Sequence, residues 1–139
     1  MVNQESSARC VLWMAASNLG GHDVKWIDRG LSCLLILGGV GHTFGVLDFY
    51  KDPHTLFWAL TASVLIFLLA AINLLRTWRS GDRALATLTA CASAAYFVVT
   101  LRFGQLIGDI TDFRVILFGV ISAGLMFFGL RDAMLRRAS

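Results

Sequence analysis

The sequence predicts an all-α integral membrane four-helix bundle, and three observations lead to this fold class. Hydrophobic residues make up 57% of the chain and charged residues only 15%, whereas a soluble domain carries roughly 25% charged residues. Uncharged stretches that could cross a bilayer recur four times, each bracketed by ionisable residues. These stretches do not alternate between apolar and polar residues, which argues against a transmembrane β-barrel. The short connections between them favour an up-down-up-down arrangement.

The four helices are predicted near residues 26–48, 55–77, 84–107 and 113–134. A span needs about 20 apolar residues to cross roughly 30 Å of hydrocarbon, and the uncharged stretch 55–75 meets this length. Asp52 and Pro53 are a start signal for the second helix, because proline fits the first helical turn. The polar segment 80–82 separates the second helix from the third.

Residues 1–25 precede the first span and are predicted to form either an interfacial helix or a frayed tail. Their apolar run, residues 10–16, is too short for the core of a signal peptide. Ser6 and Ser7 could cap a short helix that lies in the headgroup boundary and stops at Gly20. Chain termini are often poorly ordered, so both alternatives stay open.

Basic residues are placed unevenly around the predicted spans. Nine of the twelve Lys and Arg share one predicted side: Arg9, Lys25, Arg29, Arg76, Arg79, Arg83, Arg131, Arg136 and Arg137. Cytoplasmic loops hold the excess of Lys and Arg, so both termini are predicted to be cytoplasmic. The net charge of +3 is then a topology signal, and nucleic acid is not expected as a partner.

Small residues recur along several of the spans. Lipid offers no hydrophobic drive for helix association, so close backbone approach depends on such residues. Gly41 and Gly45 form the tightest pair in the first helix. The predicted packing positions are Gly38, Gly41, Gly45, Ala90, Ala94, Gly119 and Ala123. Packing between helices of one chain is favoured over a dimer interface between two chains. In either case, a bulky substitution at these positions would disturb folding or assembly.

Polar residues gather at the predicted outer ends of the first three helices. The candidate ligand-binding set is His42, Asp48, His54, Arg102, Gln105 and Asp109. The last three recur at i, i+3 and i+7, so they share one face if the third helix continues that far. A neutral His and an Arg could hold a quinone, a lipid carbonyl or an anionic headgroup. The alternative is that these residues have no ligand. The Arg102 side chain would then extend to the outer headgroups, the carboxylates would lie in water at the boundary, and His42 would bond to a carbonyl or to Thr43.

No cofactor and no metal site are predicted. His42 and His54 are the only histidine pair on the predicted outer side. A metal or haem site needs more than one well-placed ligand at the same depth in the membrane, so such a site is not expected. Haem and quinone are kept as alternatives. Cys33 and Cys91 fall inside spans and are interpreted as small hydrophobic residues. The side chain of Asn73 is interpreted as forming a hydrogen bond between helices.

The first predicted helix carries a resemblance to a known family. The segment Ile27-Asp28-Arg29-Gly30-Leu31, followed by Gly38-Gly39 and Gly41-His42-x-x-Gly45, resembles the first helix of DoxX-like small four-helix bacterial membrane proteins. No catalytic residue transfers with this resemblance. The redox associations of that family would imply a membrane subunit that works beside an oxidoreductase or a quinone pool.

These patterns predict a small non-enzymatic protein of a prokaryotic cytoplasmic membrane. It would act as a subunit or homo-oligomer, with the lipid bilayer and other membrane subunits, or itself, as partners. Motifs for hydrolase, metalloprotease or nucleotide chemistry are missing. The alternative is a quinone-, lipid- or redox-accessory protein with an outer pocket around His42 and Arg102. A third alternative, an oligomeric channel, is disfavoured because no helix carries a continuous polar stripe.

Overall fold

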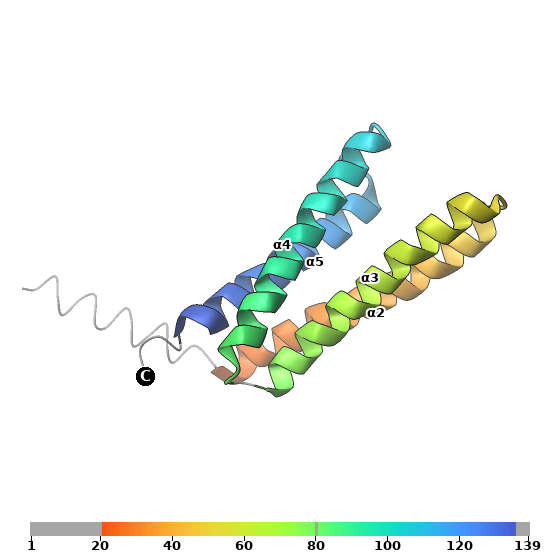
Figure 1. Cartoon of the computed structure of the whole chain (residues 1–139). Helices are drawn as coiled ribbons and strands as arrows, with labels where there is room; N and C mark the ends of the chain where they lie inside the picture. Colours follow the sequence, from red (N-terminus) through yellow and green to blue (C-terminus); the bar gives the residue numbers. More distant parts are fainter. Residues whose placement is uncertain (1–20, 80, 136–139) are drawn as a thin grey trace, which may run out of the picture.

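The computed structural model describes residues 21–79 and 81–135, which form four helices labelled α2 to α5 (Figure 1). Their bounds are Gly21–Phe49 for α2, Pro53–Trp78 for α3, Arg83–Leu106 for α4 and Phe113–Leu135 for α5. Each helix is long and apolar enough to cross a membrane, which confirms the all-helical class and the four predicted spans. Because α2 begins at Gly21, residues 21–25 belong to the first helix rather than to a separate segment. Residues 1–20 of the predicted tail or interfacial helix lie outside the described part.

Local side-chain chemistry sets the start of α3 and of α4. The Asp52 carboxylate accepts a hydrogen bond from the backbone N–H of Thr55 at 2.8 Å, and Pro53 occupies the first helical turn. Asp82 caps α4 in the same way, through the N–H of Leu85 at 3.0 Å. Each cap satisfies one of the backbone donors that the first turn leaves unpaired. The predicted Asp52-Pro53 start signal is confirmed.

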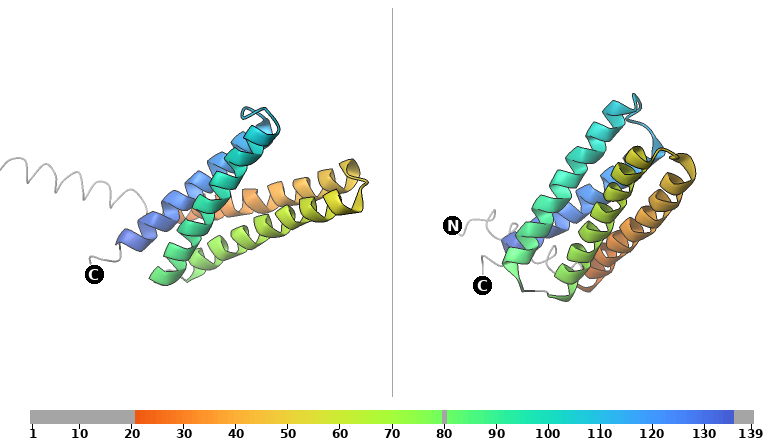
Figure 2. Two further views of the ribbon diagram at one scale, coloured as in Figure 1. Left: turned by 45° about the horizontal axis from the view of Figure 1, so that its top comes forward. Right: turned by 45° about the vertical axis from the view of Figure 1, so that its right-hand side comes forward.

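The helices pair as two antiparallel hairpins, α2 with α3 and α4 with α5. Figures 1 and 2 show the hairpins close together at one end and separated at the other. The closed end holds the connection between α3 and α4, with Arg29, Arg76, Arg83 and Arg131, and we call it the basic end. At the opposite end, short loops join α2 to α3 and α4 to α5.

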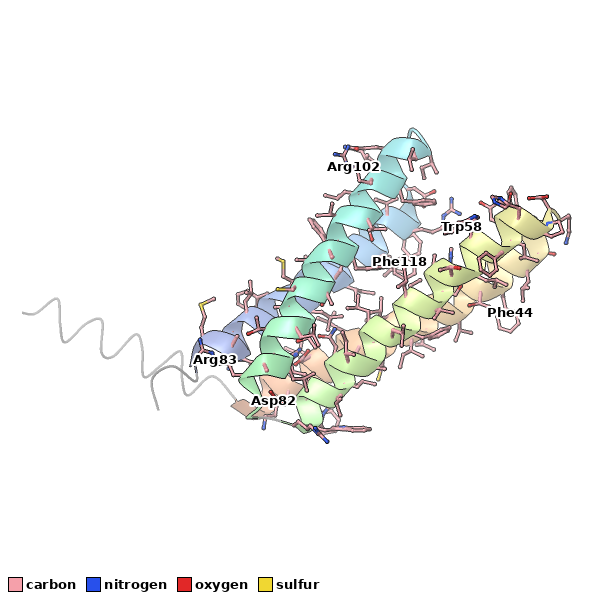
Figure 3. All side chains as sticks on the ribbon, viewed as in Figure 1. Phe44, Trp58, Asp82, Arg83, Arg102 and Phe118 are labelled. Carbon is pink, nitrogen blue, oxygen red and sulfur yellow. The ribbon has the colours of Figure 1, made fainter. Side chains whose placement is uncertain are left out.

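The apolar core occupies the middle of the bundle. It consists of Leu35, Ile66, Leu69, Ala70, Ile121 and Leu125. Phe118 of α5 packs against this cluster and meets Tyr96 of α4 edge to face, with 6.3 Å between ring centroids. The Phe118 ring also covers Gly38, where an added Cβ would lie 2.8 Å from its Cε1 atom. Phe118 therefore joins the two hairpins, and Figure 3 shows it between them.

The predicted packing positions divide into two groups. Gly38 contacts Phe118, Gly119 lies near the Phe97 ring, Ala90 is buried, and Ala94 and Ala123 are half-buried. Gly38, Ala90 and Gly119 therefore face neighbouring helices of the same chain.

Gly41 and Gly45 depart from the expectation of packing within the chain. Both are exposed, and a Cβ added at either would meet nothing within 4 Å. The close approach in α2 occurs instead at Gly39, where an added Cβ would lie 2.8 Å from Ile66 Cγ2. The helical period explains the difference: Gly39 faces α3, whereas Gly41, two residues on, is turned about 200° away from it.

Candidate functional site

A buried arginine forms the centre of a charged cluster at the basic end. Arg76 of α3 is only 2% exposed, and its Nη2 atom donates to both carboxylate oxygens of Asp28 on α2, at 2.6 and 2.8 Å. Its Nη1 atom donates to Asp132 Oδ2 on α5 at 2.6 Å. Charge-assisted hydrogen bonds of this length are among the strongest in proteins. One guanidinium therefore connects three helices.

Two polar side chains extend this cluster to the fourth helix. Asn73, one turn before Arg76, accepts from Arg76 Nη2 at 3.4 Å and donates to Ser93 Oγ on α4 at 3.4 Å. Its amide also donates to the Leu69 carbonyl at 2.9 Å. This is the interhelical contact expected of Asn73. We call Asp28, Asn73, Arg76, Ser93 and Asp132 the Arg76 cluster.

Burial differs sharply across the Arg76 cluster. The Asp28 side chain is 7% exposed, whereas that of Asp132 is 36% exposed. An ionised side chain away from water is costly unless it is paired, and Asp28 meets this requirement with two hydrogen bonds to one guanidinium. Asp132 lies at the rim of the cluster and is partly exposed. The guanidinium thus pairs with one partly exposed carboxylate and one nearly enclosed carboxylate.

Sequence reasoning assigned Arg76 to the basic flank and did not identify this cluster. The usable signal was the placement of Asp28 and Asp132, which lie just inside the first and fourth spans on the side of Arg76. A carboxylate inside a span needs a cationic partner. Whether that partner is Arg29, Arg76, Arg79 or Arg131 depends on helix rotation and register, which hydropathy does not reveal.

The predicted outer set does not converge in the structure. Its polar contacts are local ones: Arg102 Nη1 donates to Gln105 Oε1 at 3.0 Å, and Trp58 Nε1 donates to His54 Nε2 at 3.2 Å. Asp48 is exposed at the end of α2. In Figure 3, Arg102 lies on the side of α4 that faces away from the other hairpin. Within residues 21–79 and 81–135, no hydrogen bond or ion pair joins two members of this set across helices.

Asp109 is not on the helical face of Arg102 and Gln105, because α4 ends at Leu106. Gly108 adopts a φ of 74°, a conformation that favours glycine, and turns the chain out of the helix. The Asp109 carboxylate instead accepts from the N–H and hydroxyl of Thr111, at 2.8 and 2.6 Å. The predicted i, i+3, i+7 face therefore holds only for its first two members.

A groove of about 310 Å³ lies between α3 and α4 at mid-height. It is lined by Leu65, Leu68, Leu69, Ile72, Ala92, Ala95, Tyr96 and Val99. Neither His42 nor Arg102 contributes to it, so the groove is not the predicted outer pocket. In the described part of the chain, no three His, Cys, Asp or Glu side chains are placed to hold a metal ion.

The loop between α4 and α5 holds a carboxyl group, that of Asp112, whose pKa is lowered. Asp112 accepts from Arg114 Nη2 and from the Arg114 backbone N–H, both at 2.8 Å, and these bonds lower the pKa of its carboxyl to about 2. A depressed pKa contributes stability that is present above the ordinary value of 3.8 and is lost as pH falls through about 2. The Asp112 carboxyl carbon, followed by NMR, should therefore titrate near pH 2. Asp112→Asn should remove this transition, and a midpoint at the ordinary value would contradict the bonded geometry.

Comparison of the chain with known protein families, with curated proteins and with solved structures finds no match in any of the three. The fold and the Arg76 cluster define the class of protein. Its described residues, 21–79 and 81–135, form four helices able to cross a membrane, and a buried ion network connects three of these helices at one end. The resemblance of its first helix to DoxX-like proteins stays a prediction.

Proposed function

We propose that this protein is a small non-enzymatic subunit of a prokaryotic cytoplasmic membrane that associates with a second copy of itself along α2. The observation that carries the proposal is the outward position of Gly41 and Gly45. Glycines four residues apart allow two membrane helices to approach at backbone distance. Neither glycine is covered by another helix of this chain.

The surroundings of the two glycines fit a helix partner. Leu37 and Phe44 lie on the same side of α2 and are 66% and 69% exposed. Figure 3 shows Phe44 on the side of the α2–α3 hairpin that faces away from α4 and α5. The glycines provide a shallow strip and the larger side chains provide its walls, so the partner helix gains van der Waals contact there.

The Arg76 cluster supports a structural role at the basic end. Its guanidinium is bonded to two carboxylates and an amide of its own chain, so these groups hold the helices in place. The excess of basic residues at that end supports an up-down-up-down path with both termini in the cytoplasm. In this orientation, the α2 strip lies in the outer half of the bilayer.

Cysteine cross-linking in native membranes tests the association. In a chain whose three native cysteines are serine, Gly41→Cys should form a disulfide-linked dimer on mild oxidation, because equivalent positions meet across a two-fold interface. Gly41→Leu should weaken the dimer at least tenfold, a cost of about 1.4 kcal/mol, in a dilution series followed by single-molecule photobleaching. The helices should remain folded, because the added side chain meets no neighbour within the chain.

Val64→Cys is the matched control for the cross-link. Val64 lies on α3 and is 55% exposed. The antiparallel register of α2 and α3 places it level with Gly41. The Val64→Cys variant should remain monomeric under the same oxidation. Equal cross-linking at both positions would indicate random collision, and a product whose mass exceeds two chains would indicate a different partner. Either result would overturn self-association through this strip.

A further inference from the structure

The register of α2 and α3 places His42 and Ser63 at the same level of the hairpin. Gly39 packs against Ile66, and Arg29 Nε donates to Thr77 Oγ1. In an antiparallel pair, this register places His42 level with Ser63. The His42 ring also interacts with the backbone of Ala59, one turn from Ser63 on the same face of α3.

Each of these side chains has a buried polar atom without a hydrogen-bond partner. The atoms are His42 Nε2 and Ser63 Oγ, and Ser63 is only 3% exposed. Buried polar atoms are nearly always hydrogen-bonded, so two such atoms at one level need an explanation. Thr43 does not provide it, because its hydroxyl donates to the Gly39 carbonyl at 2.8 Å.

Ser63 departs from the usual behaviour of helical hydroxyls in this chain. Most of them donate to the carbonyl four residues earlier, as do Ser32, Thr43, Thr61, Thr87, Thr100 and Ser122. For Ser63 that carbonyl belongs to Ala59, which is the group that the His42 ring faces. The Ser63 hydroxyl makes no such bond, and its Oγ atom has no partner within the chain.

The hydrogen-bonding roles of the two free atoms follow from the imidazole. A charged ring without a counter-ion is costly at membrane depth, so the ring is neutral, with one N–H and one lone pair. An N–H at Nδ1 can donate to the backbone carbonyl of Ala59, and in this tautomer Nε2 carries the lone pair. Nε2 needs a donor, and the Ser63 hydroxyl can donate or accept.

We propose that His42 and Ser63 form a binding site for a single hydroxyl group between α2 and α3. The bound oxygen donates to His42 Nε2 and accepts from the Ser63 hydroxyl. The hydroxyl belongs either to a water molecule or to an alcohol or phenol dissolved in the bilayer. This site involves the α2–α3 interface alone and does not depend on association through Gly41 and Gly45.

A double-mutant cycle of the full chain tests the site. Ser63→Ala should lower the folding equilibrium constant about two- to tenfold, because it removes one hydrogen bond to the bound oxygen. In a His42→Phe background, the same change should have little effect, since the bound oxygen has already lost its acceptor. Ser122→Ala is the matched control, because that buried serine bonds within α5, and its effect should be additive with His42→Phe.

Two further measurements identify the source of the hydroxyl and guard against misfolding. The ¹⁵N shift of His42 Nε2 should change in Ser63→Ala, which an effect on folding alone would not produce. If the coupling survives complete delipidation and reconstitution in synthetic phosphatidylcholine, and His42 Nε2 shows a magnetisation-transfer signal from water, the hydroxyl is that of water. Coupling that survives without this signal would mean that Ser63 bonds His42 directly, and would overturn the site. If the coupling disappears and returns with the extracted lipid fraction, a membrane-soluble alcohol or phenol is bound. A neutral or stabilising Ser63→Ala, with no coupling to His42→Phe, would overturn the site.

Discussion

Replacing Arg76 by methionine should destabilise the folded protein by about 3–5 kcal/mol, the usual cost of removing one partner from a buried ion pair. The change leaves the Asp28 carboxylate enclosed, at 7% exposure, without the guanidinium that now bonds both of its oxygens. The bond to Asp132 would be lost at the same time. Unfolding of the variant in lipid–detergent micelles, followed by circular dichroism, measures the effect.

Arg79→Met is the control for the loss of positive charge at the basic end. Arg79 lies three residues further on and is exposed, and exposed charges contribute little to stability. Asp28→Asn in the Arg76→Met background should recover part of the lost stability, because it removes the unpaired buried charge. If Arg76→Met and Arg79→Met had equal effects, the role assigned to the Arg76 cluster would be wrong.

Gly129→Leu should separate α4 from α5 and destabilise the protein by about 1–3 kcal/mol, the usual cost of overpacking. An added Cβ at Gly129 would lie 3.0 Å from the backbone nitrogen of Ala90 and 3.1 Å from its Cα. Backbone atoms in a helix cannot rotate away as a flexible side chain can, so the two helices would have to move apart. Thermal unfolding of the purified variant provides the measurement.

The same substitution at Gly30 is the matched control for Gly129→Leu. A Cβ added at Gly30 meets nothing within 4 Å, and leucine has a higher helix propensity than glycine by up to about 1 kcal/mol. Gly30→Leu should therefore be neutral or slightly stabilising. A Gly129→Leu variant as stable as Gly30→Leu would show that α4 and α5 are not in backbone contact at Ala90.

The placement of charged residues, together with the Asp52-Pro53 start signal, predicted much of the fold. The positions of the ionisable residues marked the four spans, and Asp52 and Pro53 marked the start of α3. These features act within a few residues: hydropathy over about 20 residues decides whether a helix can cross a bilayer, and a cap acts within one turn. Such local signals can be recognised from the sequence without knowing which helices are neighbours.

The candidate site was much harder to predict from the sequence. His42 and Arg102 are in the same half of the bundle by chain order, yet Arg102 lies on a face of α4 that turns away from the other hairpin (Figure 3). Asp28, Arg76 and Asp132 resembled ordinary flanking charges, and Ser63 gave no signal. Each of these assignments depends on how a helix is rotated about its axis, and a uniformly apolar span has no marked face to reveal that rotation.

The sequence by itself determined that residues 21–79 and 81–135 form four apolar helices. It also determined the approximate ends of these helices and the end of the bundle at which basic residues gather. Only the tertiary structure decided that Arg76 is enclosed by Asp28 and Asp132, that Gly39 is packed, and that Gly41 is open. The physical reason is the range of the forces involved. Transfer from water to lipid depends on composition along one segment, whereas pairing of buried charges and contact at glycine depend on distances between segments far apart in the chain.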